Sequence, residues 1–273
     1  MKQDEFFIGW QGELPHRYKG VIRGAIIVIF AVMIAVAAIF SFSENGFIDS
    51  VFEYGELTTH EGIIRLKPVP TLQVTSPDES IKEMVLIGAF KFGAMPTILD
   101  WEEENGKKLD GKLVELRGTL IYYDDFSLLE LTEGSASILS VTESKKSTPS
   151  RKELGKKLLT GEIIDVKCFF GAMNPGSGKI HKSCGIRCID GGIPSGFKTV
   201  DDQYYILTLP EHIKGVDLFV YTGQLIQIEG ESVQIGEIKY FTPTNSNIKE
   251  IAQILPIDSY LAACSSNNGS EIN

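Results

Sequence analysis

Cysteines and basic side chains are both scarce in this chain of 273 residues. Its four cysteines are too few for the dense disulfide framework that stabilises small secreted domains. Lysine and arginine number 26 against 36 aspartates and glutamates, which gives a net charge of −10. An acidic chain of this kind lacks the basic face that neutralises phosphates, so the composition argues against a nucleic-acid-binding protein.

Long apolar runs are also scarce, and the one that stands out is Gly24–Phe42, which contains no charged residue. At a rise of ~1.5 Å per residue, a helix of this length spans roughly 28 Å, close to the ~30 Å hydrocarbon core of a bilayer. We therefore predict a transmembrane helix over 24–42. A cleaved signal peptide and a buried helix stay open as alternatives, although a signal h-region is usually shorter.

The charges that flank this run predict its orientation. Basic residues precede it and acidic residues follow it: Arg17, Lys19 and Arg23, then Glu44, Asp49, Glu53 and Glu56. The positive-inside rule then leaves 1–23 as a cytoplasmic tail and 43–273 in the periplasm or outside the cell. Residues 1–23 hold four basic and three acidic groups, a net +1, so the remaining 250 residues carry −11. The expected location is the inner membrane, with a single span.

After residue 43 the pattern becomes typical of β-strands, with short stretches rich in β-branched and aromatic residues between turn residues. The clearest candidates are 62–66, 71–74, 84–92, 113–123, 128–132, 158–168, 204–209, 218–229 and 232–241. Asp124 and Asp125 predict a hairpin turn between two of these strands.

The external region divides at a polar segment, 143–157, which we interpret as a solvated linker with a boundary near 150. This predicts a first β-rich domain over 43–149 and a second over 150–245. The remainder, 246–273, is predicted to be a C-terminal helix, over 247–264, followed by a tail.

The two halves of the external region share a pattern. Residues 110–131 and 220–241 each read as a strand with an internal glycine, a short turn and another strand. Five such strands per half suit a small Greek-key barrel of the oligonucleotide/oligosaccharide-binding (OB) type. The predicted fold is thus mainly β, with one N-terminal transmembrane helix followed by one or two small OB-like β-barrels. A single sandwich of about ten strands is the alternative.

One segment concentrates residues that carry chemistry. Cys168, His181, Cys184 and Cys188 follow the spacing C-x12-H-x2-C-x3-C among many glycines. The spacing fits neither the C-x-x-C-H of a c-type haem nor the C-x-x-C of thioredoxin-like proteins. A Rieske cluster needs a second histidine. The nearby PGSGK is not a phosphate loop, because Ile180 stands where serine or threonine would hold magnesium.

Three interpretations of this segment remain open. Three thiolates and one imidazole form a complete tetrahedral set for zinc or another thiophilic metal ion. Outside the cytoplasm, the cysteines instead favour disulfides, with Cys264 as a further partner. A redox-active thiol is the third interpretation. The turn residues Gly191–Pro194 predict that Cys188 is presented at a surface.

The same segment resembles a poorly characterised family of bacterial inner-membrane-anchored proteins that share the pattern KCxxGxMxPGxGKxHxxCxxRCxxGGIP. Here the pattern is carried by Lys167, Cys168, Gly171, Met173, Pro175, Gly176, Gly178, Lys179, His181, Cys184, Arg187, Cys188 and Gly191–Pro194. The resemblance extends to the apolar start at Phe6–Trp10 and the single anchor. It implies a link to membrane redox modules and no particular reaction.

Together these features predict an accessory or assembly subunit of a redox or respiratory-type membrane complex, which presents a Cys/His metal or thiol site outside the cytoplasm. Its expected partners are the bilayer, through 24–42, and membrane protein subunits. The alternative is a non-catalytic interaction or ligand-binding module whose OB-like barrel is stapled by disulfides. No set of acid, base and nucleophile is recognisable, so the sequence favours neither an enzyme nor an organic cofactor.

The predicted orientation is tested by adding protease to spheroplasts that express the chain with a C-terminal epitope. We expect loss of the epitope, because residues 43–273 lie outside the cytoplasmic membrane in this topology. A cytoplasmic protein in the same cells is the control and must stay intact. An epitope that is degraded only after the spheroplasts are lysed would contradict the prediction.

Overall fold

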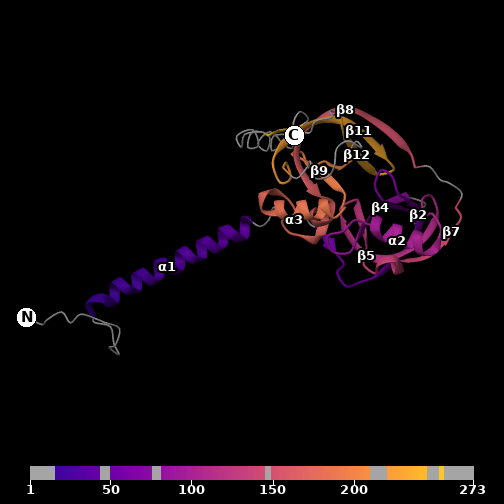
Figure 1. The fold of residues 1–273 in the computed structure, drawn as a ribbon. Coiled ribbons are helices and arrows are strands. Elements are labelled where there is room, and N and C mark those ends of the chain that lie inside the picture. The colour runs from indigo at the N-terminus through magenta and orange to yellow at the C-terminus, as the bar shows by residue number, and fades with distance from the viewer. Residues whose placement is uncertain are drawn as a thin grey trace, which may run out of the picture. The chain divides into compact units, whose positions relative to one another are not determined.

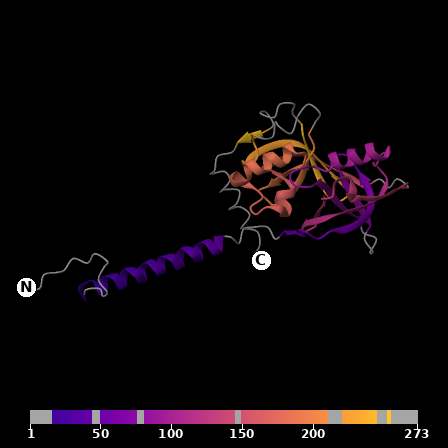
Figure 2. The same ribbon diagram turned by 60° about the horizontal axis from the view of Figure 1, so that its bottom comes forward.

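The computed structural model describes residues 16–43, 50–75, 81–144, 149–209, 220–244 and 252–254. The chain divides into two compact units, Met1–Phe47 and Ile48–Asn273, and each is described by itself. Figure 1 and Figure 2 show the helix of the first unit and the strands of the second.

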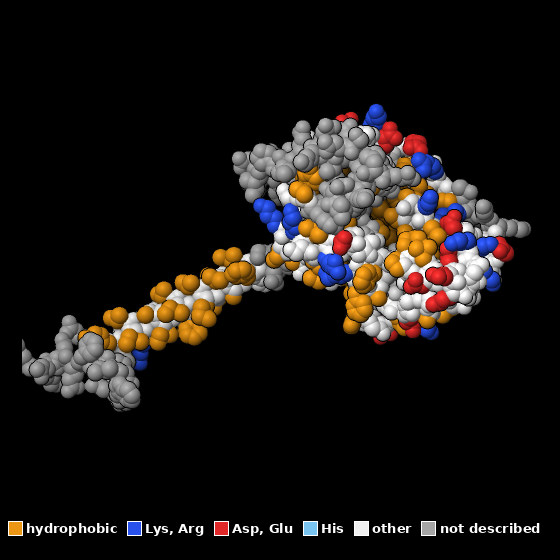
Figure 3. All heavy atoms as spheres, in the orientation of Figure 1, with side chains coloured by type: hydrophobic (Ala, Val, Ile, Leu, Met, Phe, Trp, Pro, Cys, Tyr) orange, Lys and Arg blue, Asp and Glu red, His pale blue; other side chains and the backbone are white. Residues whose placement is uncertain are grey.

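The first unit is built on one helix, α1 (His16–Ser43). Its segment Tyr18–Phe42 is long and apolar enough to cross a membrane, and none of that surface is buried. Hydrophobic side chains cover much of the helix on the face visible in Figure 3. A signal sequence has the same character. The structure thus establishes an apolar helix of spanning length over the predicted segment, and the orientation stays a prediction.

The second unit contains two β-sheets, each of which closes into a five-stranded barrel. In the first barrel the strands neighbour one another in the order β2-β3-β4-β6-β5, and β5 closes the ring by pairing with β2. The strands are β2 (Thr58–Arg65), β3 (Thr71–Thr75), β4 (Ile81–Gly88), β5 (Leu113–Tyr123) and β6 (Phe126–Leu131). Short β1 (Val51–Phe52) and β7 (Ile138–Thr142) extend the sheet along β5, and η2 (Gly134–Ser137) precedes β7.

The second barrel repeats this order. Its strands run β8-β9-β10-β12-β11, and β11 closes the ring on β8. They are β8 (Arg151–Asp165), β9 (Ser195–Thr199), β10 (Tyr204–Leu207), β11 (Ile226–Ile235) and β12 (Ile238–Pro243). In both barrels the third and fifth strands pair in parallel and every other neighbour is antiparallel, as the OB-type Greek-key barrel requires.

The two barrels confirm the predicted mainly-β fold with OB-like barrels, in place of the single sandwich. The hairpin at Asp124 and Asp125 is also confirmed, since Tyr123 pairs with Phe126 across it. Helices are inserted at different points: α2 (Met95–Asn105) follows the third strand of the first barrel, and α3 (Gly178–Asp190) follows the first strand of the second.

Two sequence-based expectations need correction. Residues 151–157, predicted as part of a solvated linker, belong to β8, where β11 supplies backbone partners and most of the charged residues stay exposed. Most of the predicted C-terminal helix lies outside the described residues. Its described part, Ala252–Ile254, is a strand, β13, which pairs with β11.

The two barrels lie side by side (Figure 1 and Figure 2) and share a buried apolar cluster. Alternate residues of β4 point in opposite directions, so Met84 and Leu86 fill the first barrel while Val85 and Ile87 face the second. Opposite them lie Ile206 of β10 and Tyr240 of β12. The shared cluster therefore buries one face of the third and fifth strands of both barrels.

Aromatic rings continue this contact at one end. Phe126 of the first barrel stacks on Phe170 of the β8–β9 connection, with centroids 4.1 Å apart and planes inclined by 13°. Tyr123 and Tyr204 also contact Phe170 from the two barrels. Large rings in such offset and edge-on pairs contribute substantially to an interface, so the barrels are joined by a genuine core and not by a flexible tether.

A buried ion pair crosses the same junction. The Lys167 ammonium, just beyond β8, donates to the Glu130 carboxylate of β6 at 2.6 Å. It also donates to the carbonyl oxygens of Phe90, at 2.6 Å, and Gly88, at 3.2 Å. The side chains of both ions are more than nine-tenths buried. A buried charge needs this many partners, because desolvation costs several kcal/mol per ion.

A second buried carboxylate, Glu83 of β4, lies under the β11–β12 turn. Burial and the neighbouring Glu237 carboxylate raise the pKa of Glu83 to about 7, although Arg65 opposes the shift. Gly236 makes this packing possible, since a Cβ there would lie 2.5 Å from the Glu83 carboxyl. The carboxyl of Glu83 is therefore neutral in mildly acidic solution.

We expect Lys167→Met to destabilise the chain by about 3–5 kcal/mol, because the change leaves a buried carboxylate unpaired. Adding Glu130→Met should restore much of this loss, since no unpaired charge remains. Guanidinium unfolding of the full chain in detergent, followed by circular dichroism, measures both effects. Arg151→Met, which breaks an exposed pair with Glu153, is the matched control and should cost less than ~1 kcal/mol. Equal stability of the two Lys167 variants would contradict the assignment.

Stability should also fall as the pH rises from about 4.5 to about 7, and level off above that range. In this window the folded chain keeps a proton on Glu83 that the unfolded chain has lost. Glu83→Gln should remove this slope and gain roughly 1–3 kcal/mol over the parent at pH 8. Glu237→Gln is the control: it removes a repelling charge, so its slope should end at a lower pH. Identical pH profiles for the parent and Glu83→Gln would refute the prediction.

Candidate metal centre

The cysteine motif occupies the connection between β8 and β9, the first two strands of the second barrel. A single π-helical turn, η3 (Cys168–Ala172), leads through a loop into α3. Gly176 lies where a Cβ would come within 2.5 Å of the Cys168 carbonyl oxygen, so the loop can fold back over the turn only with glycine there. The Gly178 N–H, at the start of α3, donates to Glu162 of β8 at 2.8 Å. These contacts hold the loop against the turn and the start of α3 against β8.

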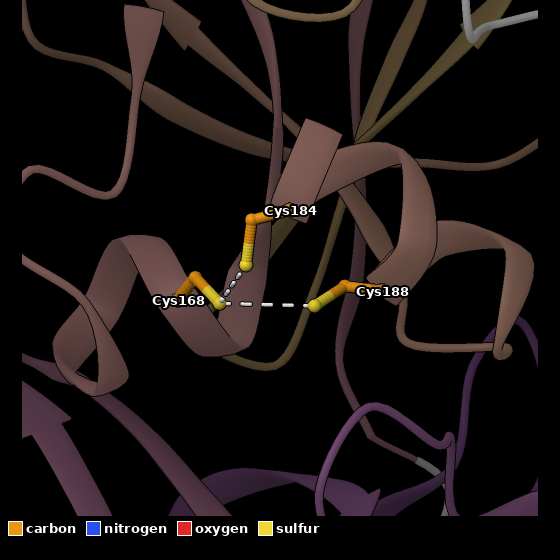
Figure 4. Close-up of side chains that lie close together, drawn as sticks. All are labelled: Cys168, Cys184 and Cys188. Carbon is orange, nitrogen blue, oxygen red and sulfur yellow. Dashed lines mark hydrogen bonds between the residues drawn. The ribbon is translucent and has the colours of Figure 1, made fainter. Parts of the chain in front are cut away.

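Three cysteine sulfurs converge between the turn and the helix (Figure 4). The Cys168 Sγ lies 3.8 Å from the Cys184 Sγ and 3.7 Å from the Cys188 Sγ. All three sulfurs are within 4.8 Å of one another. None of these three cysteines forms a disulfide, since a bonded pair would be about 2.05 Å apart.

The sulfurs differ in their access to solvent. Cys168 and Cys188 are buried, with exposed fractions of 4% and 0%, whereas Cys184 is partly exposed. The prediction that the glycine turn presents Cys188 at a surface is therefore wrong. The turn does follow α3, but it packs against the first barrel: the Gly93 N–H donates to the Gly191 carbonyl oxygen at 2.9 Å.

A buried carboxylate supports the cysteine turn from β8. One oxygen of Asp165, Oδ1, accepts the backbone N–H of Cys168 at 2.8 Å. The other, Oδ2, lies 2.9 Å from the His181 Nε2. Asp165 is fully buried and His181 nearly so. Gly185 lies next to this pair, and a Cβ there would meet the His181 ring and the Asp165 carboxylate only at ordinary contact distances of 3.5 and 3.6 Å.

A lysine from the other barrel reaches the thiols. Lys91, on the exposed loop between β4 and α2, places its Nζ 2.7 Å from the Cys184 Sγ and 3.8 Å from the Cys188 Sγ. The hydrogen bond to Cys184 raises the pKa of Lys91. Gly191 is required for this arrangement, because a Cβ there would overlap the Lys91 carbonyl oxygen at 1.8 Å.

The thiols also shift one another's ionisation. The hydrogen bond from Cys168 lowers the pKa of Cys188, with a smaller contribution from the Lys91 charge. That same bond, together with burial, raises the pKa of Cys168. Negative charge is thus favoured on Cys188 over Cys168.

The separation of the sulfurs matches a single metal ion. Two thiolates bound to one zinc at ~2.3 Å and a tetrahedral angle lie about 3.8 Å apart, close to the distances from Cys168 to its two neighbours. In a [4Fe–4S] cluster each cysteine binds a different iron atom, so the sulfurs would be spread more widely. The three donors can therefore hold one thiophilic ion.

The structure brings together three of the four predicted ligands. Cys168, Cys184 and Cys188 form one group, whereas His181 joins Asp165 and Cys168 in a second group that shares a sulfur with the first. Cys264 lies outside the described residues. Sequence reasoning missed Lys91 and Asp165. An acidic residue at the end of an apolar strand was a usable signal for Asp165, but nothing near Lys91 points to a site 93 residues away.

Comparison with known proteins yields no match to a protein-family model, to a curated protein or to a solved structure. The resemblance to bacterial membrane-anchored proteins therefore stays a prediction. The three converging thiols are the feature of the chain that bears on its function.

Proposed function

We propose that this chain is a membrane-anchored protein that holds one thiophilic metal ion on Cys168, Cys184 and Cys188. We further propose that it serves outside the cytoplasm as an accessory or assembly subunit of a membrane redox complex. The observation that carries the proposal is the convergence of three unbridged sulfurs at the spacing of ligands on one ion.

The donor set favours a soft ion. Thiolates select Cu(I) and Zn(II) among the common biological metals. Cu(I) is satisfied by three sulfurs, whereas zinc takes a fourth ligand such as water. Three thiolates carry three negative charges, and the Lys91 ammonium offsets part of that charge at the exposed side of the group.

For zinc, three protein ligands would be an incomplete set, and this supports an accessory role. A structural zinc site is closed by four protein ligands, and three leave a position for a ligand from elsewhere. Cys184 is the partly exposed sulfur, so a partner protein would reach the ion from that side. The apolar helix α1 would hold this domain at the membrane, where such a partner complex lies.

Metal titration of the full chain, purified in detergent under reducing conditions, tests the site. We expect one equivalent of Cu(I) or Zn(II) per chain. Each of Cys168→Ser, Cys184→Ser and Cys188→Ser should weaken binding by more than roughly 100-fold, since losing a ligand costs more than losing its outer-shell partner. Cys264→Ser removes a thiol that the proposed site does not use and should bind normally.

His181→Ala separates the two possible ligand sets. With three sulfur ligands the variant keeps one equivalent of metal, because His181 only braces Asp165 and the turn. Loss of stoichiometric metal in this variant, in a folded chain, would favour the four-ligand set predicted from the sequence. A reduced parent chain that binds no thiophilic ion would refute the proposed function.

A further inference from the structure

We propose that Cys184 is a peroxide-reactive thiol and that Cys168 resolves its oxidised form, which produces a Cys168–Cys184 disulfide. The inference goes beyond metal binding, since the chemistry needs no ion. It adds a modification site at two of the three sulfurs and names hydrogen peroxide or a small organic hydroperoxide as the oxidant.

Access to solvent selects Cys184 as the attacking sulfur. Cys188 is fully buried and Cys168 is nearly so, whereas Cys184 is partly exposed. A peroxide molecule arriving from solvent therefore meets the Cys184 sulfur first. Site-selective oxidation of cysteine follows such differences in exposure.

Lys91 supplies charge at the same place. Its Nζ lies 2.7 Å from the Cys184 Sγ, on an exposed loop of the other barrel. When the O–O bond of a peroxide breaks, negative charge develops on the departing oxygen, and an adjacent ammonium stabilises it. The surroundings of Cys184 thus combine access with a fixed positive charge, which is typical of reactive cysteines.

The first step is an attack of the Cys184 thiolate on one oxygen of the peroxide. An S–O bond forms, the O–O bond breaks, and the departing hydroxide takes from solvent the proton that the Cys184 thiol had released, to become water. Cys184 is then a sulfenic acid. In the second step the Cys168 sulfur attacks the Cys184 sulfur, the S–O bond breaks, and the hydroxide leaves with the Cys168 proton as a second water. Two thiols are oxidised to one disulfide, and hydrogen peroxide is reduced to two waters.

Geometry selects Cys168 as the resolving residue. Its Sγ is 3.8 Å from the Cys184 Sγ, and it approaches from a different segment, the η3 turn (Figure 4). Cys188 lies one turn along the same helix as Cys184. Residues four apart on a helix have Cβ atoms about 5–6 Å apart, beyond the ~3.5–4.5 Å of a disulfide. A bridge within α3 would therefore require the helix to unwind.

A disulfide at this position would remove two of the three metal ligands. Oxidation should then release a bound ion, and a bound ion should protect the thiols from peroxide. This coupling rests on the proposed function, whereas the bridge itself does not.

The test uses the full chain in detergent, reduced, freed of metal by a chelator and treated with one equivalent of hydrogen peroxide. Peptide mapping by mass spectrometry should identify Cys168 linked to Cys184. Cys168→Ser should instead accumulate a sulfenic acid on Cys184 that a dimedone-type reagent traps. Lys91→Met should slow formation of the bridge several-fold, whereas Arg187→Met, an exposed cation of α3 paired with Asp190, should not.

Cys188→Ser makes the two proposals separable. This variant should fail to bind metal yet still form the Cys168–Cys184 bridge. A parent chain that forms the bridge without binding metal would overturn the proposed function alone. A bridge from Cys184 to Cys188, first oxidation at Cys188, or three thiols that survive peroxide would overturn the present inference.

Discussion

The buried ion pair between Lys167 and Glu130 is the constraint on which the arrangement of the two barrels depends. A desolvated ammonium tolerates few positions, and here a carboxylate and two carbonyl oxygens of the first barrel define that position. Lys167 belongs to the second barrel and directly precedes Cys168. Because the ammonium is held in this position, the packing of the two barrels is fixed. The start of the cysteine turn is held in place by the same contacts.

The contacts at this junction also hold the thiol cluster in place. Lys167 binds the carbonyl oxygen of Phe90, and the next residue, Lys91, reaches the Cys184 sulfur. The backbone contact between Gly93 and Gly191 holds the same loop against the end of α3. Segments of both barrels thus lie around the sulfurs. The Asp165 carboxylate supports Cys168 by accepting a hydrogen bond from its backbone N–H. The sulfurs are preorganised because every segment that carries or contacts them is held by at least one polar contact.

The sequence was informative where local chemistry determines structure. The apolar run predicted α1, alternation and turn residues predicted most strands, and the clustering of Cys168, Cys184 and Cys188 predicted a shared site. It failed where distant segments decide the outcome. The charged strand 151–157 resembles a linker until β11 is placed beside it, and the exposure of the cysteines depends on the packing of the first barrel. Lys91 entered the site only through contacts that no local pattern encodes.

The position of the cluster has a thermodynamic consequence. The sulfurs all lie in one connection of the second barrel, but Lys91 and the covering loop belong to the first. A ligand that binds only the assembled arrangement stabilises it in proportion to its affinity and concentration. An ion on the three thiols would therefore favour the packed barrels, and a disulfide between two of them would withdraw that contribution. With such an ion or disulfide, the packing of the barrels and the chemistry of the cysteines would form one coupled equilibrium.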